Sequence, residues 1–161
     1  MVQEGLAVTR AVHDRYHPSK RNPYNEIECS DHYARAMASY GVYLAVCGYE
    51  YDGPAGSLAF APRVRPEDFK AAFTAAQSWG VFEQQQDGRR QQATVELTHG
   101  HLRLKTLGLQ PLDGVRMRHV RVELNGEHVA ASHALQDGRL VVRLREEQVL
   151  QDGDRLSVRI G

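Results

Sequence analysis

The feature that most constrains the fold is a period-two alternation of apolar and polar residues within residues 90–161. In the stretch VRVEL, from Val120 to Leu124, valine and leucine fall on one face while arginine and glutamate fall on the other. The stretch LSVRI, from Leu156 to Ile160, repeats the pattern. Successive side chains point to opposite faces in a β-strand but not in a helix. This half of the chain is therefore predicted to form half-buried strands.

Turn residues separate the alternating runs. Asn125-Gly126 and Asp137-Gly138 each stand between two such runs. They predict two-residue hairpins, because Asn, Asp and Gly tolerate the positive φ that these turns require. The expected strands are Thr94–Leu97, His101–Leu107, His119–Leu124, Val129–Ser132, Leu140–Arg145 and Leu156–Ile160. Several short strands at this spacing are typical of a small antiparallel β-sandwich, which we expect at residues 90–161.

The first half of the chain is expected to be helical. A first helix is predicted from about Glu4 to Tyr16. A second helix is predicted to begin at Ser30 or Asp31, since both residues are good N-caps. It is expected to end near Gly48, because glycine is a usual residue just past a helix C-terminus.

A third helix is predicted to begin at Pro66. Proline is favoured in the first turn of a helix, and Phe69 and Phe73 follow four residues apart, so they would share a helix face. A short strand is expected before it, at Ser57–Ala61. Two further aromatic residues, Trp79 and Phe82, are expected to be core or packing residues.

Polar side chains gather at the start of the second helix, although the rest of that helix is apolar on every side. A helix that is apolar all round is expected to be buried all round. At about 100° per residue, Asp31, His32 and Arg35 lie on one side of it. A buried, unpaired guanidinium costs several kcal/mol, so Arg35 needs a polar ligand or a carboxylate, such as that of Asp31, Glu26 or Glu28. Two interpretations stay open: a structural ion-pair cluster, and a pocket for a polyhydroxylated ligand.

Composition and motifs exclude several classes of function. The 20 Lys and Arg residues balance the 20 Asp and Glu residues, so nothing favours nucleic acid or an anionic membrane as a partner. No segment reaches the roughly 18 apolar residues of a membrane span. Cys29 and His32 lie three apart, but no second pair follows at zinc-finger spacing, so we expect no metal and no cofactor. Cys29 and Cys47 are expected to be buried free thiols, which makes the cytoplasm the default location.

The polar residues at the start of the second helix belong to a longer motif. The stretch RNPYNEIECSDHYARAMASYG, residues 21–41, is followed by GYEYDGP and LAFAPR. Together these closely resemble the C-terminal stretch of the bile-acid β-glucosidase, or non-lysosomal glucosylceramidase, family (glycoside hydrolase family 116). The resemblance covers about residues 20–62 and extends more weakly to about residue 84. Tyr24 stands where the family has Trp, which keeps an aromatic wall, and Ser30 stands where it has Gly.

The resemblance implies a function and a set of binding residues. The family hydrolyses β-glucosides with retention of configuration, without a metal, and folds as an N-terminal β-sandwich followed by an (α/α)6 barrel. In the matched motif, Glu26 and Arg35 would bind the outer hydroxyls of glucose, and Asn25, Glu28 and His32 are further substrate-binding candidates. The family's catalytic Glu and Asp lie upstream of the motif. This chain is therefore expected to contribute substrate-binding residues and no catalytic residue.

These observations combine into one expected architecture. We expect an α+β protein in which residues 1–84 form C-terminal helices of an (α/α)6 barrel with a connector helix. Residues 90–161 would form an accessory β-sandwich. The expected partners are a β-glucoside substrate and the remainder of the glycosidase chain. The alternative is a non-catalytic β-sandwich with an interaction or structural role. The absence of Trp, Tyr and Phe from residues 90–161 argues against sugar stacking there.

Overall fold

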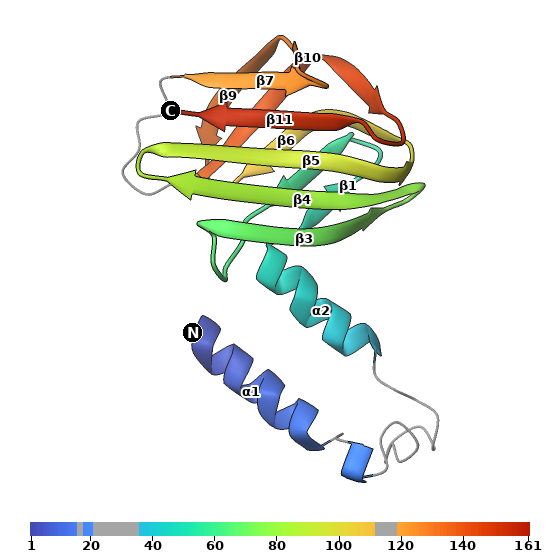
Figure 1. Ribbon diagram of the computed structural model, residues 1–161, viewed down its shortest axis with the longest axis vertical. Coiled ribbons are helices and arrows are strands. Elements are labelled where there is room, and N and C mark those ends of the chain that lie inside the picture. The colour runs from blue at the N-terminus through green and yellow to red at the C-terminus, as the bar shows by residue number, and fades with distance from the viewer. Residues whose placement is uncertain (16–17, 21–35, 112–118) are drawn as a thin grey trace. The chain divides into compact units, whose positions relative to one another are not determined.

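The computed structural model describes residues 1–15, 18–20, 36–111 and 119–161. These residues divide into two compact units, Met1–Ala45 and Val46–Gly161. The first unit is helical in its described part, and the second contains all of the described strands (Figure 1).

Two of the three predicted helices are present in the structure, within or close to the segments that the sequence indicated. Helix α1 runs over Val2–Arg15 and is followed by the short 3₁₀ helix η1, Pro18–Lys20. Helix α2 runs over Ala36–Cys47 and ends beside Gly48, whose φ is +56°. Glycine adopts this left-handed conformation without a steric penalty, so it ends the helix where the sequence predicted. The expected start of α2 at residues 30–31 lies outside the described residues.

The burial expected for the second helix is wrong in its described part. Between Ala38 and Ala45 every side chain of α2 is exposed or half-buried. Tyr40 and Tyr43 are 43% and 37% exposed, and their rings stack on one another with centroids 6.0 Å apart. An apolar sequence makes burial favourable, but it does not supply the neighbours that would cover the helix. Cys47 is only 2% exposed, which confirms the burial expected for that thiol.

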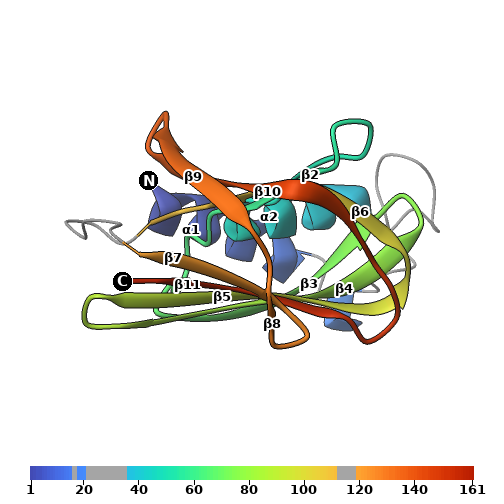
Figure 2. The same cartoon turned by 90° about the horizontal axis from the view of Figure 1, so that it is seen from above.

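Residues 46–161 form a sandwich of two sheets whose strands appear as two layers in Figure 2. The five-stranded sheet has the order β1-β2-β6-β10-β9, and the six-stranded sheet has the order β3-β4-β5-β11-β7-β8. The strands of the first sheet are β1 (Glu50–Asp52), β2 (Ser57–Phe60), β6 (Leu102–Leu109), β9 (Ala131–Gln136) and β10 (Arg139–Leu150). The strands of the second are β3 (Asp68–Ala75), β4 (Ser78–Asp87), β5 (Arg90–Gly100), β7 (Val120–Leu124), β8 (Glu127–His128) and β11 (Arg155–Ile160).

Five of the six strands expected between residues 90 and 161 are confirmed, with shifted boundaries, and so is the strand expected near Ser57. The sixth, Val129–Ser132, overlaps β9 only at residues 131–132. Both hairpin predictions are confirmed as well. Asn125 and Gly126 have φ of 53° and 85° and join β7 to β8, and Asp137 and Gly138 have φ of 49° and 77° and join β9 to β10. Positive φ at both central residues belongs to the type I′ turn, whose twist matches that of the paired strands.

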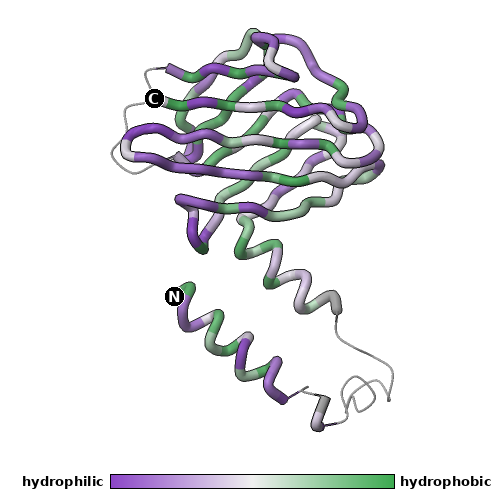
Figure 3. The backbone as a smooth tube through the Cα atoms, viewed as in Figure 1, coloured by the Kyte–Doolittle hydropathy of each residue, from purple (hydrophilic) through white to green (hydrophobic). Residues whose placement is uncertain are grey.

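The core lies between the two sheets and consists of the inward side chains of both. Figure 3 shows hydrophobic and hydrophilic positions alternating along the strands, as the sequence pattern requires. Aromatic residues fill one part of the core. The rings of Phe60 and Phe82 stack with centroids 3.9 Å apart, and Phe73 meets Phe60 edge-on at 5.8 Å. Phe60 and Phe82 are fully buried, which confirms the core position predicted for Phe82.

The helix predicted from Pro66 is wrong, because Asp68–Ala75 form strand β3. Phe69 and Phe73 lie four residues apart, a spacing that also places two residues on the same face of a strand. Pairing with β4 decides between the two, with Phe73 opposite Gly80 across the hairpin. The two residues of this hairpin turn, 76 and 77, do not have positive φ. The turn residues are Ala76 and Gln77, so the sequence contains no Asn-Gly or Asp-Gly pair that would have predicted the turn.

The expected fold class is also wrong. Residues 50–87 form strands β1 to β4 of the same compact unit as residues 90–161, so they are not helices of an (α/α)6 barrel. The described chain is mostly β, with a sandwich that is larger than expected and begins at β1. Long-range strand pairing, rather than local helix propensity, determines the conformation of this middle segment.

Candidate functional site

The residues predicted to bind a sugar lie outside the described residues. Asn25, Glu26, Glu28, His32 and Arg35 all fall within residues 21–35. The structure therefore says nothing of their geometry, and their roles stay predictions.

Within the described residues, the outer face of the five-stranded sheet carries a hollow of about 530 Å³. The base of the hollow is formed by outward-facing residues of three adjacent strands, and these residues have small or no side chains at β2 and β6. In the strand register, Ala59 of β2 stands beside Gly108 of β6, and Gly108 pairs with Val141 of β10. Inward neighbours of these residues, such as Leu58 and Leu107, are fully buried in the core. The alternation that builds the core thus also creates the shallow outer surface.

An ion pair crosses this hollow. Arg139 of β10 reaches over β6 and β2 to Glu50 of β1, with Nη1–Oε2 and Nη2–Oε1 distances of 2.6 and 2.9 Å. A Cβ added at Gly108 would lie 3.0 Å from Arg139 Cδ and 2.9 Å from Ala59 Cβ. Glycine at this position therefore leaves the space in which the arginine side chain lies along the sheet.

The ion pair keeps its carboxylate charged. Hydrogen bonds from Arg139 lower the pKa of Glu50, aided by the charge of the guanidinium and opposed by partial burial. The same hydrogen bonds raise the pKa of Arg139. A glutamate whose pKa is lowered is a poor general acid at neutral pH, because it holds no proton to donate.

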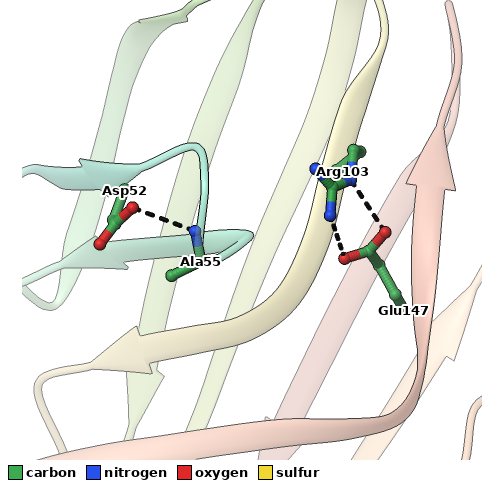
Figure 4. Close-up of polar contacts among 4 residues, drawn as sticks. All are labelled: Asp52, Ala55, Arg103 and Glu147. Atoms are coloured by element: carbon green, nitrogen blue, oxygen red, sulfur yellow. Dashed lines mark hydrogen bonds and ion pairs between the residues drawn. The ribbon is translucent and has the colours of Figure 1, made fainter.

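Two further polar contacts lie on this sheet (Figure 4). The Asp52 carboxylate accepts the backbone N–H of Ala55 at 3.1 Å, which closes the β1–β2 connection. Arg103 donates two hydrogen bonds to Glu147, both 2.9 Å long. These bonds lower the pKa of Glu147, with burial acting against them. Glu147 is therefore also held as a carboxylate, like Glu50.

This arrangement fits binding or packing better than catalysis. The acids at the hollow are paired with arginine or with a backbone N–H. Among the described residues that line the hollow, Arg143 is the charged one that forms no hydrogen bond or ion pair through its side chain. No group of three His, Cys, Asp or Glu residues that could hold a metal occurs in the described part of the chain. Within the same residues, no helix has the length and apolar character needed to cross a membrane.

Sequence reasoning missed the residues of this hollow. Glu50 and Arg139 are 89 positions apart, and each is a charged residue at the start of its strand, Glu50 in the three-residue β1 and Arg139 in the 12-residue β10. The only available signal was the small outward residue at Gly108. Trp79, which was expected to be a core or packing residue, is 46% exposed and is therefore not a core residue.

Comparison with known proteins adds no assignment to this geometry. No protein-family model matches the chain, and no curated protein matches its sequence.

Proposed function

We propose that this chain is a non-catalytic part of a β-glucoside-hydrolysing enzyme. In this proposal, Glu26 and Arg35 bind glucose and Val46–Gly161 serves as a structural β-sandwich module. The observation that supports it is the close resemblance of residues 20–62 to the glycoside hydrolase family 116 motif. The catalytic pair would come from polypeptide outside this sequence.

The chemistry of the motif fits a glucose site. Retaining glycosidases use two carboxyl groups, one as nucleophile and one as acid/base, and hydrogen bonds to the sugar hydroxyls strengthen in the transition state. A carboxylate and a guanidinium side by side supply such bonds to neighbouring hydroxyls. Each charge-assisted hydrogen bond contributes about 1.5–3 kcal/mol, so the loss of Glu26 or Arg35 would weaken binding about ten- to a hundredfold.

The sandwich is better suited to packing than to sugar stacking. Residues 90–161 contain no Trp, Tyr or Phe, and the outer face of the five-stranded sheet is crossed by the Arg139–Glu50 ion pair. Sugar-binding surfaces rely on exposed aromatic rings for contact area. Among the strands, only β4 carries a large exposed aromatic side chain, Trp79, within the described residues. These features support a structural role for Val46–Gly161.

Ligand-observed NMR on the full chain tests the proposal. A glucose-shaped iminosugar should show saturation transfer with the unaltered chain, and the transfer should be lost in Glu26→Gln and Arg35→Met. Glu4→Gln and Arg10→Met are matched controls, because both residues lie on α1 with side chains 74% and 76% exposed. The controls should retain the signal.

Two results would contradict the proposal. One is the absence of saturation transfer at millimolar iminosugar. The other is transfer that persists unchanged in Glu26→Gln and Arg35→Met, which would place the sugar elsewhere. The chain alone should not hydrolyse an aryl β-glucoside, and measurable turnover would contradict its non-catalytic role.

A further inference from the structure

The edges of the two sheets differ in how well they are protected against pairing with another strand. An edge strand presents unpaired N–H and C=O groups, and proteins blunt such edges with short strands, charges, proline or bulges. The described edge strands are β1, β9, β3 and β8. Strand β1 has three residues, two of them acidic, and β8 has two residues. Strand β3 is longer but carries Asp68 and Lys70.

Strand β9 lacks all of these protections. Its sequence is ASHALQ, with no Asp, Glu, Lys, Arg or Pro, and its six residues pair with β10 without a bulge. All six are exposed, and Leu135 is 57% exposed on the side that faces the core elsewhere in the sheet. It is therefore the longest uncharged edge among the described strands.

The hairpin geometry identifies which backbone groups of β9 are free. Gln136 stands opposite Arg139 across the two-residue turn, so this pair exchanges both of its backbone hydrogen bonds. The pattern alternates along the strand, and the Arg145 N–H donating to the Ala130 carbonyl at 2.8 Å continues it. The even-numbered residues therefore bond to β10. The N–H and C=O groups of Ala131, His133 and Leu135 point away from it, to the free edge.

From this edge we propose that β9 pairs with β9 of a second copy of the chain, antiparallel and about a two-fold axis at His133. In this register His133 faces its own copy, and Ala131 faces Leu135 of the second copy. The three outward residues of each strand then exchange about six backbone hydrogen bonds. Each exposed Leu135 lies against a small alanine, so the two leucines do not face each other.

A second copy of the chain is the expected partner because β9 can pair with itself in a symmetric register. A two-fold interface requires one patch to match itself. A strand without Asp, Glu, Lys or Arg meets this requirement, because no permanently charged side chains of like sign face one another. Pairing at β9 joins the two five-stranded sheets into one continuous sheet. It also removes from water the backbone groups that make an unprotected edge prone to uncontrolled association.

Sedimentation velocity over a wide concentration range tests the proposal with a matched pair of variants. His133→Lys places two like charges directly opposite each other on the two-fold axis and should raise the dimer dissociation constant at least about tenfold. Gln136→Lys changes the net charge equally, but its backbone groups bond to β10 and it lies at the end of the pairing. This control should dissociate like the unaltered chain. Far-UV circular dichroism would show that both variants remain folded.

Amide hydrogen exchange supplies an independent measurement. In the dimer, the amides of Ala131, His133 and Leu135 should become protected as the protein concentration rises. The amides of Ser132 and Ala134 should be protected at every concentration, since they bond to β10 in the monomer. A chain that stays monomeric throughout would overturn the proposal. So would a dimer that is insensitive to His133→Lys or leaves the odd-numbered amides unprotected, because its interface would lie elsewhere.

Discussion

Replacing Asp154 by alanine should destabilise the sandwich by about 1–3 kcal/mol, because this side chain joins two connections. Its Oδ2 accepts the N–H of Gln151 at 2.8 Å, and its Oδ1 accepts the Asn125 side-chain amide at 2.7 Å. Asn125 Oδ1 in turn accepts the N–H of Arg155 at 2.9 Å. The loop between β10 and β11 is thereby tied to the β7–β8 turn.

The expected magnitude follows from these contacts. Hydrogen bonds to a charged group contribute about 1.5–3 kcal/mol each when buried, and both would be lost. Asp154 is only half-buried, so water can replace part of the loss, which reduces the expected total to the stated range. Asp152 in the same loop is the matched control. Its carboxylate is 60% exposed and lies 3.3 Å from His99, so Asp152→Ala should change stability by less than about 0.5 kcal/mol.

The effect should depend on pH with a definite sign. The hydrogen bond from the backbone of Gln151, followed by that from Asn125, lowers the pKa of Asp154 in the folded chain, against the effect of burial. A lowered folded-state pKa contributes stability that is fully present above the unfolded pKa, about 3.9. This contribution is lost as the pH falls through the folded value. The stability difference between the unaltered chain and Asp154→Ala should therefore be constant near neutrality and shrink below about pH 4.

Urea denaturation followed by circular dichroism measures these differences directly. A double-mutant cycle with Asn125→Ala should show coupling between Asn125 and Asp154, because each side chain bonds the other. The reasoning would be refuted if Asp154→Ala and Asp152→Ala cost the same at pH 7. It would also be refuted if the cost of Asp154→Ala did not decrease in acid.

Three further outcomes are expected from the packing of the sandwich. Phe82→Ala should cost about 3–5 kcal/mol in urea denaturation, because Phe82 is fully buried and stacked on another ring, and a cost below about 1 kcal/mol would contradict that packing. Arg139→Met should raise the pKa of Glu50 toward its ordinary value, which a carboxyl NMR titration measures, and should change the free energy of unfolding by less than about 1 kcal/mol. An unchanged pKa of Glu50 would exclude the ion pair. Gly108→Val should raise the pKa of Glu50 by displacing Arg139, and it should lower the free energy of unfolding by about 1–3 kcal/mol through overpacking. An unchanged stability would contradict the close packing around Gly108.

Some of the fold could be predicted because its signals are local. The alternation in β7 and β11 and the Asn125-Gly126 turn depend only on neighbouring residues, and the structure confirms them. Helix α1 was predictable for the same reason. The candidate hollow was not predictable, since the residues around it come from strands that are far apart in the chain.

Errors arose where a local pattern permits two structures. The spacing of Phe69 and Phe73 suits a helix face and a strand face equally, and only the partner strand β4 distinguishes them. Helix α2 shows the converse problem. Its sequence is apolar on every side, yet burial depends on which neighbours surround it, and most of its described side chains remain accessible.

The sequence by itself determined which segments between residues 90 and 161 are strands, and where two type I′ turns join them, because side-chain periodicity and turn chemistry act over a few residues. Only the tertiary structure decided that residues 68–75 form a strand rather than a helix. It also decided that Glu50 pairs with Arg139, which lies 89 positions away in the sequence. The free energy that decides these features comes from strand pairing and core burial between distant residues, and no short stretch of sequence contains both partners.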